Sequence, residues 1–223
     1  MPEYSVSPAG EKFAIPGPDA YAPEMERLDG LVDAARAEGK EVVVVMGVGF
    51  VGAVMAAIIA DTVDEKTGRP SKFVIGCQRP STRSFWKIPL LNRGTSPVKA
   101  EDPEVDPMIA RCVLDKKTLT ATFASDCLGL ADCVVVDVQC DYAKHDLGNM
   151  RTGEADMAAL EATMRLIGEK IPPECLVLIE TTVAPGTTEF VAMPIMRKAF
   201  RARGITSDAC GGMPPVFTTF ADR

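Results

Sequence analysis

The chain has 223 residues, 47% of them hydrophobic, which suits one large domain, or one domain with appendages, around a substantial core. Its net charge of −7, without any long basic run, argues against a general nucleic-acid surface. Residues 1–23 lack the apolar stretch of a secretory signal, and glycines interrupt the longest apolar run, at residues 42–59. We therefore expect neither a secretory signal nor a membrane span.

Apolar periodicity predicts strands and helices that alternate along most of the chain. Residues 1–22, rich in Pro and Gly, are interpreted as an irregular extension, and a long loop is expected at residues 78–106. Helices are predicted at residues 23–38, 51–60, 107–115, 126–130 with Ser125 as its cap, 156–169 and 188–203. Strands are predicted at residues 42–46, 72–77, 119–122, 133–138, 176–179 and, last, 216–220.

Continuous apolar strands separated by helices are typical of a parallel sheet that is buried on both faces. We therefore predict an α/β fold, a doubly wound Rossmann-type parallel sheet with helices on both faces. Residues 41–223 are assigned to this domain, and residues 1–40 to an N-terminal extension with its helix.

The seven cysteines form no C-x-x-C pair, and several of them lie within apolar runs. Buried free thiols in a reducing cytoplasm explain this pattern most simply. No spacing of His, Cys and Asp suggests a metal site, so none is expected. His145 has no acid–base partner in view and is interpreted as a surface residue.

A glycine-rich turn follows the first strand of the predicted sheet and opens the next helix. It reads Gly47-Val48-Gly49-Phe50-Val51-Gly52, the G-x-G-x-x-G pattern of a dinucleotide site. Gly47 would permit the tight turn, Gly49 would let a pyrophosphate approach the backbone, and Gly52 would let helix and strand pack closely. Amide groups at the helix start, with the positive end of its dipole, would hold the phosphates. The alternative is a glycine turn with a structural role only.

The end of the second strand of this sheet bears on the choice of cofactor. NAD-binding units place an acidic residue there, which accepts hydrogen bonds from the ribose hydroxyls. Here the position falls at Gln78, with Arg79 next to it. Gln can hydrogen-bond a ribose hydroxyl without repelling a 2′-phosphate, and Arg79 either pairs with such a phosphate or is a solvated loop residue. The residues themselves leave NAD and NADP open.

The sequence resembles the UDP-glucose/GDP-mannose dehydrogenase family of nucleotide-sugar 6-dehydrogenases. The resemblance lies in the glycine turn and in three further segments, at residues 91–103, 131–138 and 179–189. The NAD-binding domain of that family carries G-x-G-x-V-G, then I-N-x-G-x-x-P-x-x-E, then S-T-V-P-P-G-T. Ordered matches are more specific than any single glycine motif. The second motif is matched by Asn92, Gly94, Pro97 and Glu101, and the third by Thr182, Val183, Pro185, Gly186 and Thr187.

The resemblance implies a cytoplasmic enzyme of polysaccharide biosynthesis that oxidises the C6 hydroxyl of a UDP- or GDP-sugar to a carboxylate. Family members use two NAD-linked hydride transfers, an aldehyde-level intermediate and a thioester on a catalytic cysteine. The Thr of their S-T-V-P motif lies at the nicotinamide end and helps to orient the catalytic water, a role that falls here to Thr182. The alternative is that Thr181 and Thr182 are ordinary strand residues. The resemblance favours NAD, and full-length members are expected to form homo-oligomers.

The chain also departs from the family pattern. Where the family has Pro-Thr-Pro after the fourth strand, Cys140 takes the place of the Thr, and we expect it or Asp141 to supply that cofactor contact. The catalytic G-F-G-G-x-C motif follows the family's NAD-binding domain, and the residues around Cys210 have the reverse order. We therefore expect this chain alone to bind a dinucleotide but to be inactive on sugars. The alternative is a non-catalytic dinucleotide-binding module that needs a partner chain or is a truncated remnant.

Overall fold

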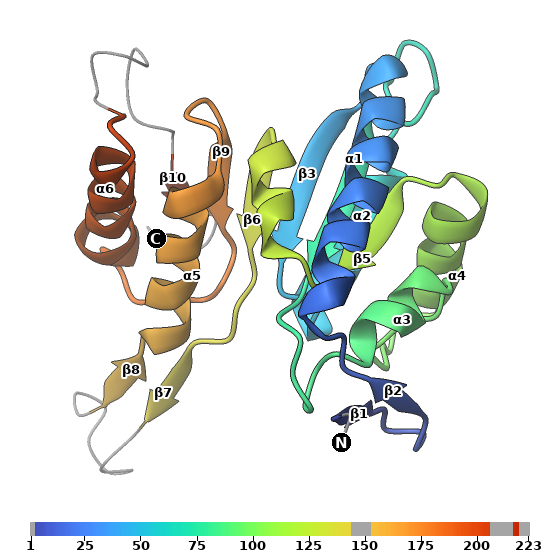
Figure 1. Ribbon diagram of the computed structural model, residues 1–223, viewed down its shortest axis with the longest axis horizontal. Coiled ribbons are helices and arrows are strands. Elements are labelled where there is room, and N and C mark those ends of the chain that lie inside the picture. Colours follow the sequence, from blue (N-terminus) through green and yellow to red (C-terminus); the bar gives the residue numbers. More distant parts are fainter. Residues whose placement is uncertain (1–2, 144–152, 206–215, 219–223) are drawn as a thin grey trace.

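A parallel sheet of six strands forms the centre of the computed structural model, which describes residues 3–143, 153–205 and 216–218 (Figure 1). The strands lie in the order β10-β9-β6-β3-β4-β5. Because the sheet starts in its middle, at β3, and winds outwards in both directions, this is the doubly wound Rossmann order. The predicted fold class is confirmed. The strands are β3 (Glu41–Met46), β4 (Lys72–Cys77), β5 (Leu119–Thr122), β6 (Cys133–Val136), β9 (Leu176–Ile179) and β10 (Val216–Thr218).

Helices cover both faces of the sheet, and the alternating side chains of β3 point to each face in turn. Val42, Val44 and Met46 belong to one core, and Val43 and Val45 belong to the other. A run of β-branched residues suits such a strand, since successive side chains point to opposite sides. The first core also contains residues of α1 (Tyr21–Ala37), α5 (Ala158–Lys170) and α6 (Met193–Ala202), and the second contains residues of α2 (Phe50–Asp61), α3 (Lys87–Asn92) and α4 (Val105–Ala110).

Two long predicted helices are each divided into an α-helix and a π-helical turn. The turn η2 (Arg111–Asp115) follows α4, and the turn η4 (Thr188–Ala192) precedes α6. Pro194 is the second residue of α6, and because proline has no N–H it cannot continue the pattern of backbone bonds from the turn before it.

The predicted cap at Ser125 is wrong. The segment is a 3₁₀-helix, η3 (Ser125–Leu130), whose N-cap is Ala124 and which has no side-chain cap. Ser125 is itself the first residue of this helix, and its hydroxyl oxygen lies 3.4 Å from the hydroxyl oxygen of Tyr21. The helix therefore begins one residue earlier than the sequence suggests.

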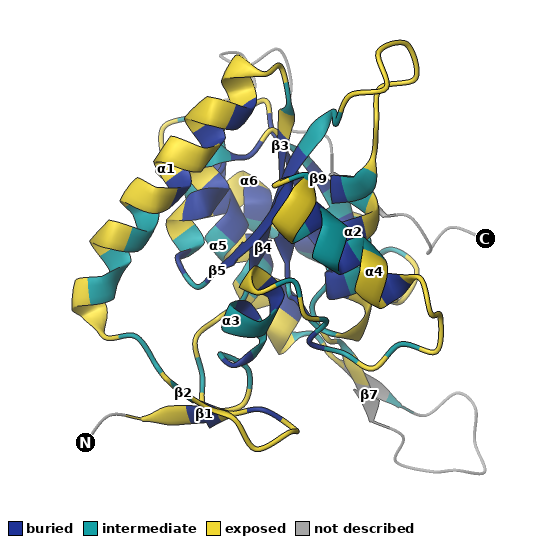
Figure 2. Cartoon of the chain, turned by 90° about the vertical axis from the view of Figure 1, so that its right-hand side faces the viewer, coloured by how far each residue is buried: buried dark blue, intermediate teal, exposed yellow. Residues whose placement is uncertain are grey.

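The N-terminal segment is more regular than expected. β1 (Tyr4–Val6) and β2 (Lys12–Ala14) form an antiparallel hairpin, and a 3₁₀-helix, η1 (Pro18–Ala20), leads into α1. The hairpin lies beside α3 (Figure 2), and the buried Ser5 hydroxyl donates to the Thr82 carbonyl oxygen over 2.9 Å. Strands this short have no readable period, and the residue that Ser5 contacts, Thr82, is distant in sequence. Residues 1–22 were therefore wrongly expected to be irregular.

Helix α3 lies inside the segment that was expected to be a loop. Its third residue is Pro89, which pattern reading treats as a helix breaker. In the first turn, however, backbone N–H groups have no acceptor within the helix, so a proline there removes no hydrogen bond. The buried side chains of Ile88 and Leu91 hold α3 against the sheet.

Beyond β6 the chain forms a second antiparallel hairpin, β7 (Asp141–Ala143) with β8 (Glu154–Asp156), which projects from one end of the molecule next to α5 (Figure 1). The helix predicted from residue 156 therefore begins at Ala158. His145 and Cys210 lie outside the described residues. Within residues 3–143, 153–205 and 216–218, no helix is long and apolar enough to cross a membrane.

Candidate dinucleotide site

The glycine-rich turn lies at the carboxyl end of β3, where the direction of winding reverses. β3 pairs with β4 on one side and with β6 on the other, and doubly wound sheets bind their ligands at this switch point. The Gly47 N–H donates to the Cys77 carbonyl oxygen over 2.9 Å, and the Asp137 N–H donates to the Met46 carbonyl oxygen over 2.9 Å. The turn is thus held by the ends of both neighbouring strands.

The three glycines meet different requirements. Gly47 has a φ of +100°, and a Cβ there would lie 2.5 Å from the Asp137 carbonyl oxygen. A Cβ on Gly52 would lie 1.9 Å from the Gly47 carbonyl oxygen, whereas a Cβ on Gly49 would meet nothing within 4 Å. The fold therefore requires Gly47 and Gly52. Gly49 leaves open space in front of the backbone, as the close approach of a ligand requires.

Helix α2 begins directly after Gly49, which is its N-cap and makes no side-chain capping bond. The first N–H groups of a helix have no acceptor within it, so they are available to an anion. The side chains of Phe50 and Val51 are 67% and 51% exposed, so these two residues would contribute through their backbone amides. Val48 is buried, and its Cγ1 lies 2.6 Å from where a Cβ of Gly76 would be. No sequence pattern indicates that Gly76 makes this room.

Gln78 reaches across from the end of β4 to the glycine turn. The Val48 N–H donates to the side-chain oxygen of Gln78 over 3.1 Å, and the Gln78 N–H donates to the Thr122 carbonyl oxygen over 2.9 Å. The next residue, Arg79, is exposed. The structure thus places Gln78 and Arg79 beside the turn.

The two threonines at the end of β9 differ in their surroundings. The Thr181 hydroxyl donates to the Val138 carbonyl oxygen over 2.8 Å, which ties the end of β9 to the end of β6. The Thr182 side chain is exposed on the same carboxyl edge of the sheet that carries the glycine turn. Thr181 therefore has a structural role, and Thr182 is the threonine that a ligand at this edge can reach.

A family model described as "UDP-glucose/GDP-mannose dehydrogenase family, NAD binding domain" matches residues 41–209. The chain belongs to this family. No curated protein matched it in the sequence search.

Among solved structures, the chain is similar to an NDP-N-acetyl-D-galactosaminuronic acid dehydrogenase from Methanosarcina mazei, with 32% identity over 77% of this chain and 33% of that one, and a TM-score of 0.61. It is similar to a GDP-mannose dehydrogenase from Pseudomonas aeruginosa, with 25% identity over 70% of this chain and 32% of that one, and a TM-score of 0.56. A UDP-D-ManNAc dehydrogenase from Pyrococcus horikoshii shares the fold, with 23% identity over 78% of this chain and 35% of that one, and a TM-score of 0.56. The chain spans about a third of the length of each structure.

As a domain of the UDP-glucose/GDP-mannose dehydrogenase family, the chain takes NAD as its cofactor. The described residues fit the pyrophosphate of this group, because Gly49 leaves the backbone open and the first amides of α2 lie next to it. Bound NAD supplies a hydride acceptor. In such a complex, residues 47–52 would hold the pyrophosphate, and the end of β4 would face the ribose.

The family motif that begins at Asn92 has a structural explanation. The Asn92 side-chain oxygen accepts the Ala121 N–H over 2.6 Å, and its side-chain nitrogen donates to the Ala121 carbonyl oxygen over 2.9 Å. Two residues later Gly94 has a φ of +75°, a conformation that favours glycine. This motif fastens the end of α3 to β5, the edge strand of the sheet.

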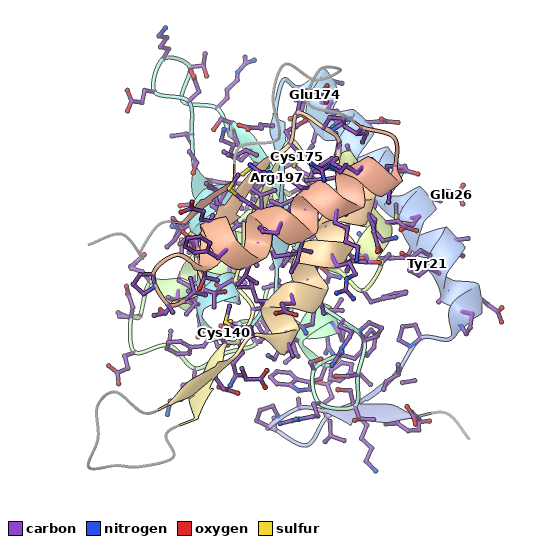
Figure 3. The ribbon with its side chains drawn as sticks, turned by 90° about the vertical axis from the view of Figure 1, so that its left-hand side faces the viewer. Tyr21, Glu26, Cys140, Glu174, Cys175 and Arg197 are labelled. Carbon is purple, nitrogen blue, oxygen red and sulfur yellow. The ribbon has the colours of Figure 1, made fainter. Side chains whose placement is uncertain are left out.

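Cys140, which replaces the family's threonine, lies where the chain leaves β6 for β7 (Figure 3). Its side chain is half-buried, and burial raises the pKa of the thiol, with Asp141 and Asp156 raising it further. Cys140 is therefore a neutral thiol at pH 7, and in that form it is a weak hydrogen-bond donor. The other cysteines within the described ranges, Cys77, Cys112, Cys127, Cys133 and Cys175, are buried free thiols.

Two carboxyl groups that the sequence patterns did not single out for the site lie at the ends of β6 and β9. Asp137 Oδ2 and Glu180 Oε2 are buried, and neither has a hydrogen-bond partner among the described residues. Burial raises the pKa of Asp137, and the pKa of Glu180 is raised by burial and then by the nearby Asp137. Asp137 Oδ2 lies 3.1 Å from where a Cβ of Gly52 would be. A charged residue directly after a continuous apolar strand was the available signal for Asp137.

No group of three or more His, Cys, Asp or Glu side chains in the described part of the chain is placed to hold a metal ion.

Proposed function

We propose that this chain is the cofactor-binding part of an enzyme that oxidises the C6 hydroxyl of a UDP- or GDP-sugar to a carboxylate. The observation that carries the proposal is the placement of the open glycine turn and the exposed Thr182 on one edge of the sheet. The names of the Methanosarcina and Pseudomonas dehydrogenases, which act on nucleotide sugars, support the same substrate class.

In this proposal the cofactor is held by residues 47–52, together with Gln78, Arg79 and Cys140. Thr182 lies at the nicotinamide end and orients the water that attacks the reacting carbon. Thr181 holds the loop in place through its bond to the Val138 carbonyl oxygen. In this proposal residues 41–223 are the dinucleotide-binding domain, and residues 1–40 are an N-terminal extension with its helix. The buried free cysteines support a reducing, cytoplasmic location, in keeping with a role in polysaccharide biosynthesis.

The resemblance implies that the catalytic cysteine of the family follows the NAD-binding domain. The polypeptide of these 223 residues should therefore bind NAD without oxidising sugar. The test is NADH absorbance with UDP-glucose, GDP-mannose and UDP-N-acetyl sugars, alongside calorimetric titration with NAD. Binding without turnover is expected. Turnover by the 223 residues alone would contradict this division of roles, and absent NAD binding would contradict the proposed function.

Oxidation at C6 is tested on the natural protein to which this sequence belongs. We expect it to form two equivalents of NADH for each sugar consumed, because an alcohol reaches a carboxylate through two hydride transfers. We expect Thr182→Ala to lower kcat there more than KM, since a group that orients water acts in the transition state. A natural protein that binds NAD but oxidises none of these sugars would favour the alternative, a non-catalytic dinucleotide-binding module.

A further inference from the structure

The N-terminal extension contacts the carboxyl edge of the sheet, where the glycine turn lies. Its described part, residues 3–40, comes before the segment that the family model matches, which begins at residue 41. Hydrogen bonds nevertheless join the extension to the end of β5 and to the segment that leaves β4. Gln78, at the end of β4, is bonded to the glycine turn, so these contacts reach the candidate dinucleotide site.

One path of hydrogen bonds runs from α1 to the glycine turn. Glu24 Oε1 accepts from the Thr122 hydroxyl over 2.6 Å, and the Thr122 carbonyl oxygen accepts the Gln78 N–H over 2.9 Å. The Gln78 side-chain oxygen in turn accepts the Val48 N–H over 3.1 Å. Helix α1 is thus joined through the ends of β5 and β4 to the turn itself.

Glu24 is firmly held at the start of this path. Its side chain is 15% exposed, and both of its carboxylate oxygens accept from Arg27, over 2.7 and 2.9 Å. Arg27 also donates to the Thr120 hydroxyl oxygen over 3.1 Å and to the Ala121 carbonyl oxygen over 3.4 Å. Because hydrogen bonds between charged groups are the strong ones, α1 is fastened to β5 beside the residue that holds Gln78.

A second path runs from the hairpin β1–β2 to the segment that leaves β4, which contains neither helix nor strand up to residue 86. The fully buried Ser5 hydroxyl donates to the Thr82 carbonyl oxygen over 2.9 Å and accepts the Trp86 N–H over 3.1 Å. Within the segment, the Ser84 hydroxyl donates to the Arg79 carbonyl oxygen over 3.0 Å. The backbone directly after Gln78 is therefore held in one shape, in part by the hairpin.

Both paths act on residues at the position of a bound dinucleotide. In a doubly wound sheet the pyrophosphate lies at the glycine turn and the ribose at the end of the next strand, where Gln78 is. A ligand binds more weakly when it must itself order the residues that it meets. The contacts of the extension fix Gln78 and Val48 before a ligand arrives, so the loss of these contacts should weaken binding.

We propose that the N-terminal extension is part of the cofactor site, with Ser5 and Glu24 as positioning residues for NAD. Neither residue touches the cofactor in this proposal. Glu24 acts through Thr122 on Gln78, and Ser5 acts through the backbone of residues 79–86. The proposal rests on the proposed function, because it requires the dinucleotide site at residues 47–52.

The test is calorimetric titration with NAD of the purified chain and of its variants, with circular dichroism to confirm that each is folded. Ser5→Ala and Glu24→Ala should each raise the Kd for NAD by about fivefold, because Gln78 and the residues after it are no longer held in advance. Glu24→Gln keeps an oxygen that accepts from Thr122, so its Kd should stay within about twofold of the wild type. Residues with a structural role only would change the melting temperature and leave the Kd unchanged.

A further variant and two controls complete the set. Thr122→Val removes the bond to Glu24 from the other side and leaves Glu24 paired with Arg27. It should give the same rise in Kd, and it replaces Glu24→Ala if that variant does not fold. Val6→Ala, at an exposed position of β1, and Glu26→Ala, whose side chain points away from the molecule (Figure 3), should leave the Kd unchanged.

The outcomes separate this proposal from the proposed function. An unchanged Kd in the folded Ser5→Ala, Glu24→Ala and Thr122→Val variants, with NAD binding by the wild type, would overturn the proposal and leave the dinucleotide site in place. An equal rise in Kd in the two control variants would also overturn it. Absence of NAD binding by the wild type would overturn the proposed function, and this inference with it.

Discussion

Gly52 packs so closely against Gly47 that a Cβ at position 52 would lie 1.9 Å from the Gly47 carbonyl oxygen. This contact sets how near α2 comes to the end of β3. Gly52→Ala should therefore lower the free energy of unfolding by about 2 kcal/mol or more, because the carbonyl is backbone and cannot move aside. Urea unfolding measures the change, and Gly49→Ala, placed in open space, is the control. Equal stability of the two variants would contradict the described packing.

The buried carboxyl of Asp137 should make stability depend on pH. Burial raises the pKa of Asp137, so the folded state holds this proton more tightly than the unfolded chain. The free energy of unfolding then falls as pH rises from about 3.9, the ordinary value for Asp, through the raised pKa of the folded state.

Replacement of this carboxyl gives the corresponding measurement. Asp137→Asn should be more stable than the wild type at pH 7, by about 1 kcal/mol, and the gain should shrink towards pH 4. It should also lower the pKa of Glu180, since the acid at 137 contributes to raising it. Urea unfolding at several pH values checks the first point. A variant less stable than the wild type at pH 7 would mean that Asp137 has a partner in solution.

Asp61, the last residue of α2, should make stability depend on pH in the opposite direction from Asp137. Its carboxylate accepts from Arg111 over 2.8 and 3.0 Å and from Lys116 over 2.8 Å. Chiefly through Arg111, these bonds hold the pKa of Asp61 well below its usual range, although burial opposes them. Its stabilisation is therefore complete above about pH 4 and is lost as pH falls through the lowered pKa of the folded state.

Asp61→Asn should therefore cost about 2 kcal/mol of unfolding free energy at pH 7, and less in acid. Because the site is remote from the glycine turn, the Kd for NAD should stay within about twofold of the wild type. Thermal or urea unfolding, with a parallel NAD titration, distinguishes the two effects. A large loss of NAD affinity in a folded variant would be evidence that this end of α2 also shapes the cofactor site.

The threonine pair at the end of β9 offers a matched comparison. Thr181→Val removes the hydroxyl that donates to the Val138 carbonyl oxygen and should lower the free energy of unfolding by about 1 kcal/mol. Thr182→Ala removes an exposed hydroxyl and should leave stability unchanged within about 0.5 kcal/mol. Both are measured by urea unfolding. The reverse order of stabilities would assign the structural role to Thr182.

Strands such as residues 42–46, 133–136 and 176–179 could be predicted because each is a continuous apolar run, and such a run indicates a strand that is buried on both faces. The glycine turn could be predicted because its spacing between a strand and a helix is a local pattern, although the contact that requires Gly47 is with Asp137, a residue distant in the chain. The hairpin β1–β2 and helix α3 could not, because Ser5 and Ile88 are stabilised by contacts with residues distant in the chain.

The candidate site shows the same division between local and distant information. Gln78 was found because its place after a strand is a local feature. The difference between Thr181 and Thr182 depends on which of them meets β6, and the unpaired oxygens of Asp137 and Glu180 depend on burial by other elements. Periodicity in a single sequence does not carry this information.

The most direct test of the dinucleotide site is a calorimetric titration with NAD of the wild-type chain and of Gly49→Val. The extended backbone of Gly49 and the open space around it accept a valine, so the variant should fold, losing at most about 1 kcal/mol at the helix cap. The wild type should bind NAD at a single site, and the folded variant should bind none, because the side chain blocks the pyrophosphate. Equal affinity in the two proteins would contradict the site.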